Sequence, residues 1–76
     1  MRDYNRIPPK GMPERIRKCV YESEKTVIDI CKELRINRSR LYDYMNGVTP
    51  PNATIIVRMC EVFNVAAGWL LTGDKQ

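Results

Sequence analysis

Two stretches of helical periodicity lie almost end to end between residues 26 and 46, and this spacing constrains the fold more than any other feature of the chain. In the first stretch, apolar residues recur at i, i+3, i+4 and i+7, the pattern of a helix with one buried face. They are Val27, Ile30, Cys31 and Leu34. Thr26 precedes the first stretch and Asn37 precedes the second, and both are residue types that cap helix N-termini. Because only Arg35 and Ile36 separate the first helix from the second cap, the two helices must turn sharply on one another.

The second helix of this pair has two unlike faces. At about 100° per residue, most of its polar side chains fall within one arc, and its large, mostly apolar side chains crowd the other side. The polar arc holds Arg38, Ser39, Tyr42, Asp43 and Asn46, and the other side holds Leu41, Tyr44 and Met45. Gly47 follows as the residue type that most often ends a helix in the left-handed conformation. The sequence therefore predicts that one face packs in a core and the other presents hydrogen-bonding groups at close spacing.

Three further helices are predicted from the same periodicity. The first begins at Pro13, the fourth is capped by Asn52 after Pro50-Pro51, and a short fifth precedes Gly73. Their apolar positions are Ile16, Cys19 and Val20 in the first, Ile56, Met59, Cys60 and Phe63 in the fourth, and Trp69, Leu70 and Leu71 in the fifth. The fourth also carries a second apolar set, Ile55, Met59 and Val62, which suits either a central buried helix or a surface that pairs with a second copy. No segment alternates as a strand would, so the predicted fold class is all-α, a compact five-helix domain.

Residues 1–12 are predicted to form a flexible basic arm, and residues 13–76 a single helical domain. The Pro8-Pro9 step opposes helix formation in the arm. Three basic residues are spaced along it: Arg2, Arg6 and Lys10. Such an arm can lie along phosphates or in a minor groove, and a disordered tail with no role in binding is an equal alternative.

Positive charge is concentrated in the N-terminal half of the chain. Residues 1–40 hold 11 Lys and Arg against 6 Asp and Glu, whereas residues 41–76 hold 2 against 3. An uneven basic charge suits a polyanionic partner, and nucleic acid is favoured over a membrane surface because no long basic amphipathic helix is present. Charge alone leaves open the alternative of an ordinary solvated surface.

The cysteines and the absence of histidine argue against metal or catalytic chemistry. Cys19, Cys31 and Cys60 are widely spaced, and the chain has no histidine to complete a zinc site. No serine or cysteine has a candidate base partner in a recognisable motif. We therefore expect no metal, no cofactor and no enzymatic activity.

Hydropathy argues against a membrane protein. No apolar run approaches the roughly 20 residues that a membrane-spanning helix needs. The N-terminus also lacks the order of charged and then apolar residues that is typical of a signal peptide. The expected location is therefore cytoplasmic.

The order of these motifs resembles the phage repressor and Cro (XRE-like) family of helix-turn-helix domains. The segments that carry the resemblance are the stretch from Thr26 through "DICKELRINRSRLYDYMNG", then "PPN", then "MCEVFNVAAGWLLTGD". It covers roughly Pro13 to Asp74. The resemblance implies a five-helix, lambda-repressor-like domain that binds double-stranded DNA, usually as a homodimer, with its third helix in the major groove.

Position by position, the resemblance assigns two sets of contacts to DNA. The residues offered to base edges are Asn37, Arg38, Ser39, Tyr42 and Asp43. The residues offered to phosphates are Thr26, Arg35, Arg40 and Asn46. The chemistry agrees, because arginine can bond guanine O6 and N7 together, aspartate can accept from cytosine N4, and serine can bond either kind of group. The alternative is that these side chains are only the solvated side of a structural helix.

The chain departs from the family pattern at several positions. Val27 stands where the family commonly has a glutamine that bonds a phosphate, and Arg35 stands where the turn usually has glycine. Val20 and Met45 occupy the two positions at which many members join the first helix to the end of the third by an arginine–glutamate pair. Replacing both charges together by apolar residues is physically coherent, and it predicts that these two side chains touch.

The leading prediction is a sequence-specific transcriptional regulator of phage or prophage type. Two alternatives remain open from the sequence. One is an antitoxin or modulator that uses the same fold to bind a protein partner, and the other, less favoured, is a small enzyme.

Overall fold

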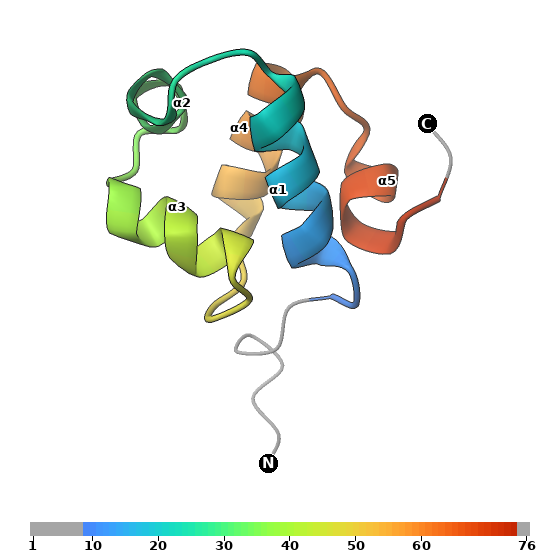
Figure 1. Ribbon diagram of the computed structural model, residues 1–76. Helices are drawn as coiled ribbons and strands as arrows, with labels where there is room; N and C mark the ends of the chain where they lie inside the picture. The colour runs from blue at the N-terminus through green and yellow to red at the C-terminus, as the bar shows by residue number, and fades with distance from the viewer. Residues whose placement is uncertain (1–8, 75–76) are drawn as a thin grey trace.

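Five helices make up the part of the chain that the computed structural model describes, residues 9–74, and no strand occurs there (Figure 1). The helices are α1 (Met12–Glu22), α2 (Val27–Leu34), α3 (Arg38–Met45), α4 (Ala53–Phe63) and α5 (Ala67–Thr72). The predicted all-α, five-helix fold is confirmed. Residues 1–8, which make up most of the predicted arm, lie outside the described residues.

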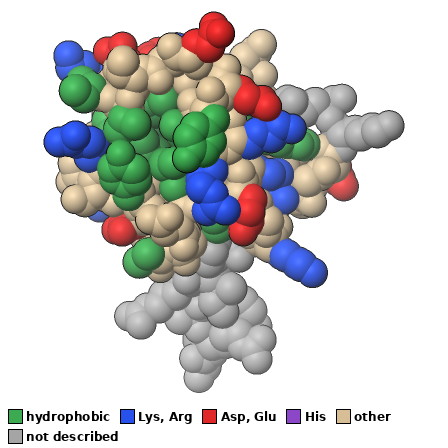
Figure 2. All heavy atoms as spheres, viewed as in Figure 1, with side chains coloured by type: hydrophobic (Ala, Val, Ile, Leu, Met, Phe, Trp, Pro, Cys, Tyr) green, Lys and Arg blue, Asp and Glu red, His purple; other side chains and the backbone are tan. Residues whose placement is uncertain are grey.

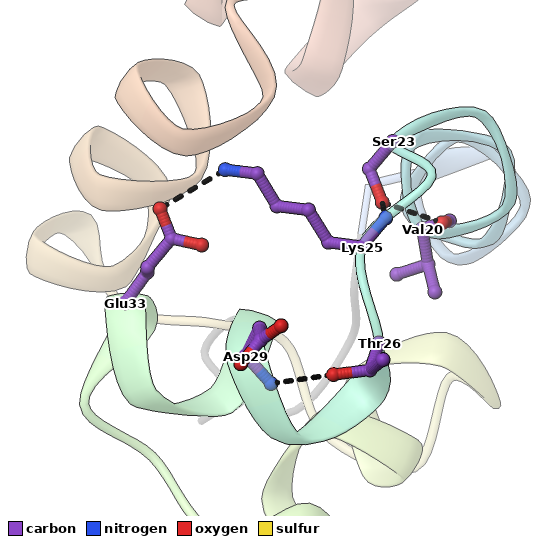
Figure 3. Close-up of polar contacts among 6 residues, drawn as sticks. All are labelled: Val20, Ser23, Lys25, Thr26, Asp29 and Glu33. Atoms are coloured by element: carbon purple, nitrogen blue, oxygen red, sulfur yellow. Dashed lines mark hydrogen bonds and ion pairs between the residues drawn. The ribbon is translucent and has the colours of Figure 1, made fainter.

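Three of the helices begin at the caps that the sequence predicts. The Thr26 hydroxyl accepts a hydrogen bond from the N–H of Asp29 at 3.1 Å (Figure 3). The side-chain oxygens of Asn37 and Asn52 accept the N–H groups three residues ahead at 2.8 and 2.9 Å. Each cap satisfies an N–H that has no partner within its helix, and such caps contribute about 1 kcal/mol each.

The core lies where the helices converge. α1 packs against α3 and α5, α2 packs against α3 and α4, and α4 packs against α5 (Figure 1). The buried residues are Met12, Ile16, Val20, Ile30, Cys31, Leu34, Leu41, Tyr44, Met45, Ile55, Met59 and Leu70. All five helices contribute, which agrees with the predicted apolar stripes of α1, α2 and α3. Val20 and Met45 both belong to this core, and a direct contact between them stays a prediction.

Two details of the core differ from the sequence prediction. α1 begins at Met12, one residue early, and the Met12 side chain has no exposed surface, so an arm can extend no further than Gly11. In α4, Ile55 and Met59 are the buried residues, whereas Ile56 is only partly buried. The two buried residues, Ile55 and Met59, both belong to the second apolar set that the sequence predicted for α4. The direction of burial is set by the helices packed around α4, which the periodicity of one segment does not encode.

Arg15 ties α1 to the end of α5. Its Nε donates to the carbonyl of Leu70 at 2.9 Å, and its Nη2 donates to the carbonyls of Leu71 and Lys10, both at 3.0 Å. Carbonyls at a helix C-terminus lack partners within the helix and carry partial negative charge, so a guanidinium is well suited to them. Gly11, at φ 81°, leaves room for this side chain, because a Cβ there would lie 2.5 Å from Nη1 of Arg15.

The cysteines are free thiols on three different helices. Cys19 and Cys31 are buried, and Cys60 is partly buried. Burial raises the pKa of Cys19 to about 11, and the negative charge of Glu22 adds to the shift. This thiol is therefore neutral near pH 7.

Within residues 9–74, no group of histidine, cysteine, aspartate or glutamate side chains could hold a metal ion. The helices in the same range are all too short or too polar to cross a membrane.

Candidate nucleic-acid interface

A three-residue turn, Arg35 to Asn37, joins α2 to α3. The N–H of Arg35 donates to the carbonyl of Lys32 at 3.2 Å, and the N–H of Ile36 donates to that of Cys31 at 3.0 Å. This pair of bonds is the Schellman arrangement, which needs a left-handed residue after the helix. Arg35 takes that conformation, with φ 61° and ψ 44°. The backbone of Arg35 is therefore strained, at a cost of about 1–2 kcal/mol.

Arginines from elsewhere in the chain hold both helices of the pair at their C-terminal ends. Nη1 of Arg58, on α4, donates to the carbonyl of Leu34 at the end of α2 at 3.1 Å. Nη1 of Arg17, on α1, donates to the carbonyl of Met45 at the end of α3. These contacts were not predicted from the sequence, because each joins residues that are more than 20 positions apart. The two bonds fix the ends of α2 and α3 and thereby the angle at which α3 is presented.

α3 ends as the sequence predicts. Gly47 has φ 74°, and the N–H of Val48 donates to the carbonyl of Asp43 at 2.9 Å. This is again the Schellman arrangement, and glycine adopts its left-handed position without the Cβ penalty. The chain can therefore leave α3 abruptly and start towards α4.

The two predicted faces of α3 are separated in the structure. Leu41, Tyr44 and Met45 are buried, whereas Arg38, Ser39, Arg40, Tyr42 and Asn46 are exposed. Asp43 is the exception, because it is half-buried although the helical arc predicted an open position. The exposed arc presents a guanidinium, a hydroxyl, a phenol and an amide at close spacing.

The remaining predicted contact residues lie at the start of α2 and in the turn. Thr26, Arg35 and Asn37 are all exposed. The side-chain oxygens of Thr26 and Asn37 accept the capping bonds described above, so what each can still offer a ligand is a donor: the hydroxyl proton and the amide NH2. Asn37 thus serves first as a structural cap.

Five arginines of the described residues fall into two groups. Arg15, Arg17 and Arg58 are used to bond helix C-terminal carbonyls. By contrast, the guanidiniums of Arg35 and Arg38 make no hydrogen bond or ion pair with any other part of residues 9–74. Unneutralised positive charge therefore sits at the turn and at the first residue of α3.

Arg40 is placed differently from Arg38. Burial raises the pKa of the Tyr44 phenol, and the positive charge of Arg40 opposes that shift, so the Arg40 guanidinium lies near Tyr44. Since the two arginines are about 200° apart around the helix, they leave α3 in different directions. They are therefore suited to different contacts.

The surface around this region is mixed. On the face drawn in Figure 2, hydrophobic side chains gather on the side of the molecule formed by α2 and α3, with Lys and Arg side chains around them. Among residues 9–74, the exposed large hydrophobic residues are Ile28 on α2, Tyr42 on α3 and Val48 just after it, together with Tyr21 on α1 and Val57 on α4. Apolar and cationic groups together are what a protein needs to contact both base edges and a charged backbone.

Comparison with protein families gives one match. A family model described as helix-turn-helix matches residues 15–70, which run from the first turn of α1 to the middle of α5. The match therefore includes α2, the turn and α3 in full. No curated protein and no solved structure matches the chain.

Proposed function

The chain belongs to the helix-turn-helix family, and on that premise we propose that it is a sequence-specific transcriptional regulator of phage or prophage type, whose α3 reads the major groove of a short operator. Members of this family are DNA-binding regulatory proteins and are generally not enzymes. The chain's function is accordingly DNA binding of the transcription-regulator type, and the operator and the mode of reading are what the proposal adds.

The observation that carries the proposal is the exposed arc of α3 together with its free positive charge. Arg38 lies in the first turn of α3, exposed, and its guanidinium has no partner within residues 9–74, so it can bond guanine O6 and N7 together. Ser39 and Tyr42 lie beside it, and Asn37 adds an amide donor at the end of the helix. Asp43, although half-buried, is assigned to cytosine N4, and each good base contact contributes about 1–3 kcal/mol of discrimination.

A second set of residues is assigned to the DNA backbone. Thr26 offers a hydroxyl at the N-terminus of α2, Arg35 a free guanidinium at the turn, and Asn46 an exposed amide at the end of α3. Arg40 leaves α3 on the flank and reaches a phosphate. Such contacts fix the register of the protein and carry no sequence information themselves.

The proposed active form is a homodimer. Two copies of α3 must lie about 34 Å apart to read successive major grooves of a partly palindromic site. Sedimentation that shows only monomer, at high protein concentration and on operator DNA, would remove this part of the proposal.

A second candidate function is binding of a protein partner, as an antitoxin or modulator. It is favoured by large apolar side chains that are left exposed, with Tyr21 77% and Ile28 57% accessible. Stable co-purification with one protein, without any preferred DNA sequence, would favour this candidate over the regulator.

The test of the regulator is operator enrichment from random duplex DNA, followed by two alanine variants. We expect Arg38→Ala to weaken operator binding by about 1–3 kcal/mol and to relax specificity at one base pair. Arg40→Ala should weaken binding to all sequences alike and lower the slope of log K against log salt concentration by about one. If Arg38→Ala lowers affinity for random and operator DNA by the same factor, base reading by this residue is refuted.

A further inference from the structure

A pocket of about 350 Å³ opens between the C-terminal half of α1, the C-terminal end of α4 and α5. Its walls include Lys18, Cys19, Glu22, Phe63, Val65 and Trp69. None of the lining residues belongs to α2 or α3. In Figure 1 the C-terminal ends of α1 and α4 lie at the top of the view, whereas α3 lies at the lower left. The pocket is therefore separate from the surface assigned to DNA.

The pocket combines an apolar wall with hydrogen-bond donors that have no partner. Phe63, Val65 and Trp69 supply the apolar side. The ammonium of Lys18 and the indole N–H of Trp69 make no bond within residues 9–74. A donor of either kind is stabilised when an acceptor reaches it in a place partly shielded from water.

One cation of the lining is available to an anion. The lining holds the cations Lys18 and Lys25 and the carboxylate Glu22. Lys25 turns its ammonium to Glu33 on α2, at 3.0 Å from Oε1 (Figure 3), which leaves Lys18 as the lining cation without a protein partner. The thiol of Cys19 adds no negative charge, because burial keeps its pKa near 11.

We propose that this pocket binds a small organic carboxylate, with the carboxylate on Lys18 and the apolar body against Phe63, Val65 and Trp69. The volume lies at the low end of the range of about 300–1,000 Å³ that is usual for small-molecule sites, so the ligand is compact. A purely apolar ligand would make no bond to Lys18 or Trp69, and a simple inorganic anion would leave the aromatic wall unused. This site and its ligand are independent of the proposed reading of DNA by α3.

Trp69 is the only tryptophan of the chain and forms part of the pocket wall, so its fluorescence reports on occupancy. The experiment titrates the full chain with 3-phenylpropionate, with 3-phenylpropanol as a neutral analogue and with acetate as a charge lacking the apolar body. We expect a saturable change with 3-phenylpropionate and roughly tenfold weaker binding of either analogue, the difference that one charge-assisted hydrogen bond or one buried ring supplies.

Two variants test the assigned contact. Lys18→Met keeps the apolar stem of an exposed residue and should weaken 3-phenylpropionate roughly tenfold. Lys32→Met makes the same change at an exposed position of α2 outside the pocket and should leave the titration unchanged. Thermal melts of both variants check that each remains folded.

Three titration results would each overturn the proposal. They are equal binding of 3-phenylpropionate and 3-phenylpropanol, no saturable change with 3-phenylpropionate, and an unchanged titration in Lys18→Met. A fourth result would be a Trp69 fluorescence that changes with protein concentration alone, without reversal by 3-phenylpropionate. That result would mean that a second copy of the chain fills the pocket, and it would also overturn the proposal.

Discussion

Replacing Arg35 by glycine is expected to stabilise the fold and to weaken DNA binding at the same time. Arg35 has φ 61° and ψ 44°, a conformation that costs a residue with a Cβ about 1–2 kcal/mol. Glycine removes this cost but loses about 0.5–1 kcal/mol more backbone entropy on folding. The net gain is about 0.5–1 kcal/mol, which raises the melting temperature of a domain of this size by about 2–8 °C.

The effect on DNA binding comes from the lost guanidinium. The Arg35 side chain is exposed and unpartnered within residues 9–74, and we have assigned it to a phosphate. Loss of one phosphate contact lowers the slope of log K against log salt concentration by about 0.9. Fluorescence anisotropy of a labelled duplex at several salt concentrations measures this slope, and a thermal melt of the same preparation measures the stability.

Two further variants separate the backbone effect from the charge effect. Glu24 also has a left-handed backbone, with φ 60°, so Glu24→Gly should raise the melting temperature without lowering the salt slope. Arg35→Ala keeps a Cβ at the strained position and should lower the slope with no gain in melting temperature. If Arg35→Gly melts no higher than the wild type while Glu24→Gly does, the strain argument fails for this turn. An unchanged slope in both Arg35 variants would refute the phosphate contact.

Three more perturbations have defined outcomes. Arg17→Met should lower the free energy of unfolding in urea by about 1 kcal/mol, because the Met45 carbonyl loses its charged donor, whereas Lys18→Met should change it little. Deletion of residues 1–11 should weaken binding to all DNA sequences alike and flatten the salt dependence, and unchanged affinity would show that the arm takes no part. The pKa of Cys19 is raised to about 11 in the folded chain, so the unfolded thiol loses its proton first and stability should fall as the pH rises from about 9 towards 11. Thermal melts of the wild type and Cys19→Ala across that range should show the larger loss in the wild type.

The features that the sequence predicted well are those with local causes. The caps at Thr26, Asn37 and Asn52 depend on side chains that bond N–H groups three residues ahead, and all three are present. The left-handed conformation of Gly47 follows from how a helix ends when the chain leaves it abruptly. Each of these features depends on residues within about one helical turn, so it can be predicted from the sequence alone.

The features that escaped prediction depend on partners distant in the chain. In α4, Ile55 rather than Ile56 is buried in the domain core, because the helices packed around α4 determine which of its sides is buried. Met12 was assigned to the arm, yet it is fully buried once α1 has neighbours to pack against. Asp43 is half-buried for the same kind of reason, since its surroundings come from the whole fold and not from α3 alone.

The arginines show most directly how the fold divides charge between structure and binding. From the sequence, every cation in the N-terminal half was available to a polyanion. In the structure, Arg15 and Arg17 bond the carbonyl ends of α5 and α3, and Arg58 bonds that of α2. These guanidiniums donate to carbonyls that have no partner within their helix, and their charge compensates the negative end of the helix dipole. They are therefore poorly placed to neutralise phosphates as well. The surface whose positive charge is available to DNA is therefore smaller than the net charge implies. Among the arginines, the available ones lie at the turn and at the start of α3. A salt slope much steeper than these residues and the arm could supply would require the capping arginines to leave their carbonyls on binding.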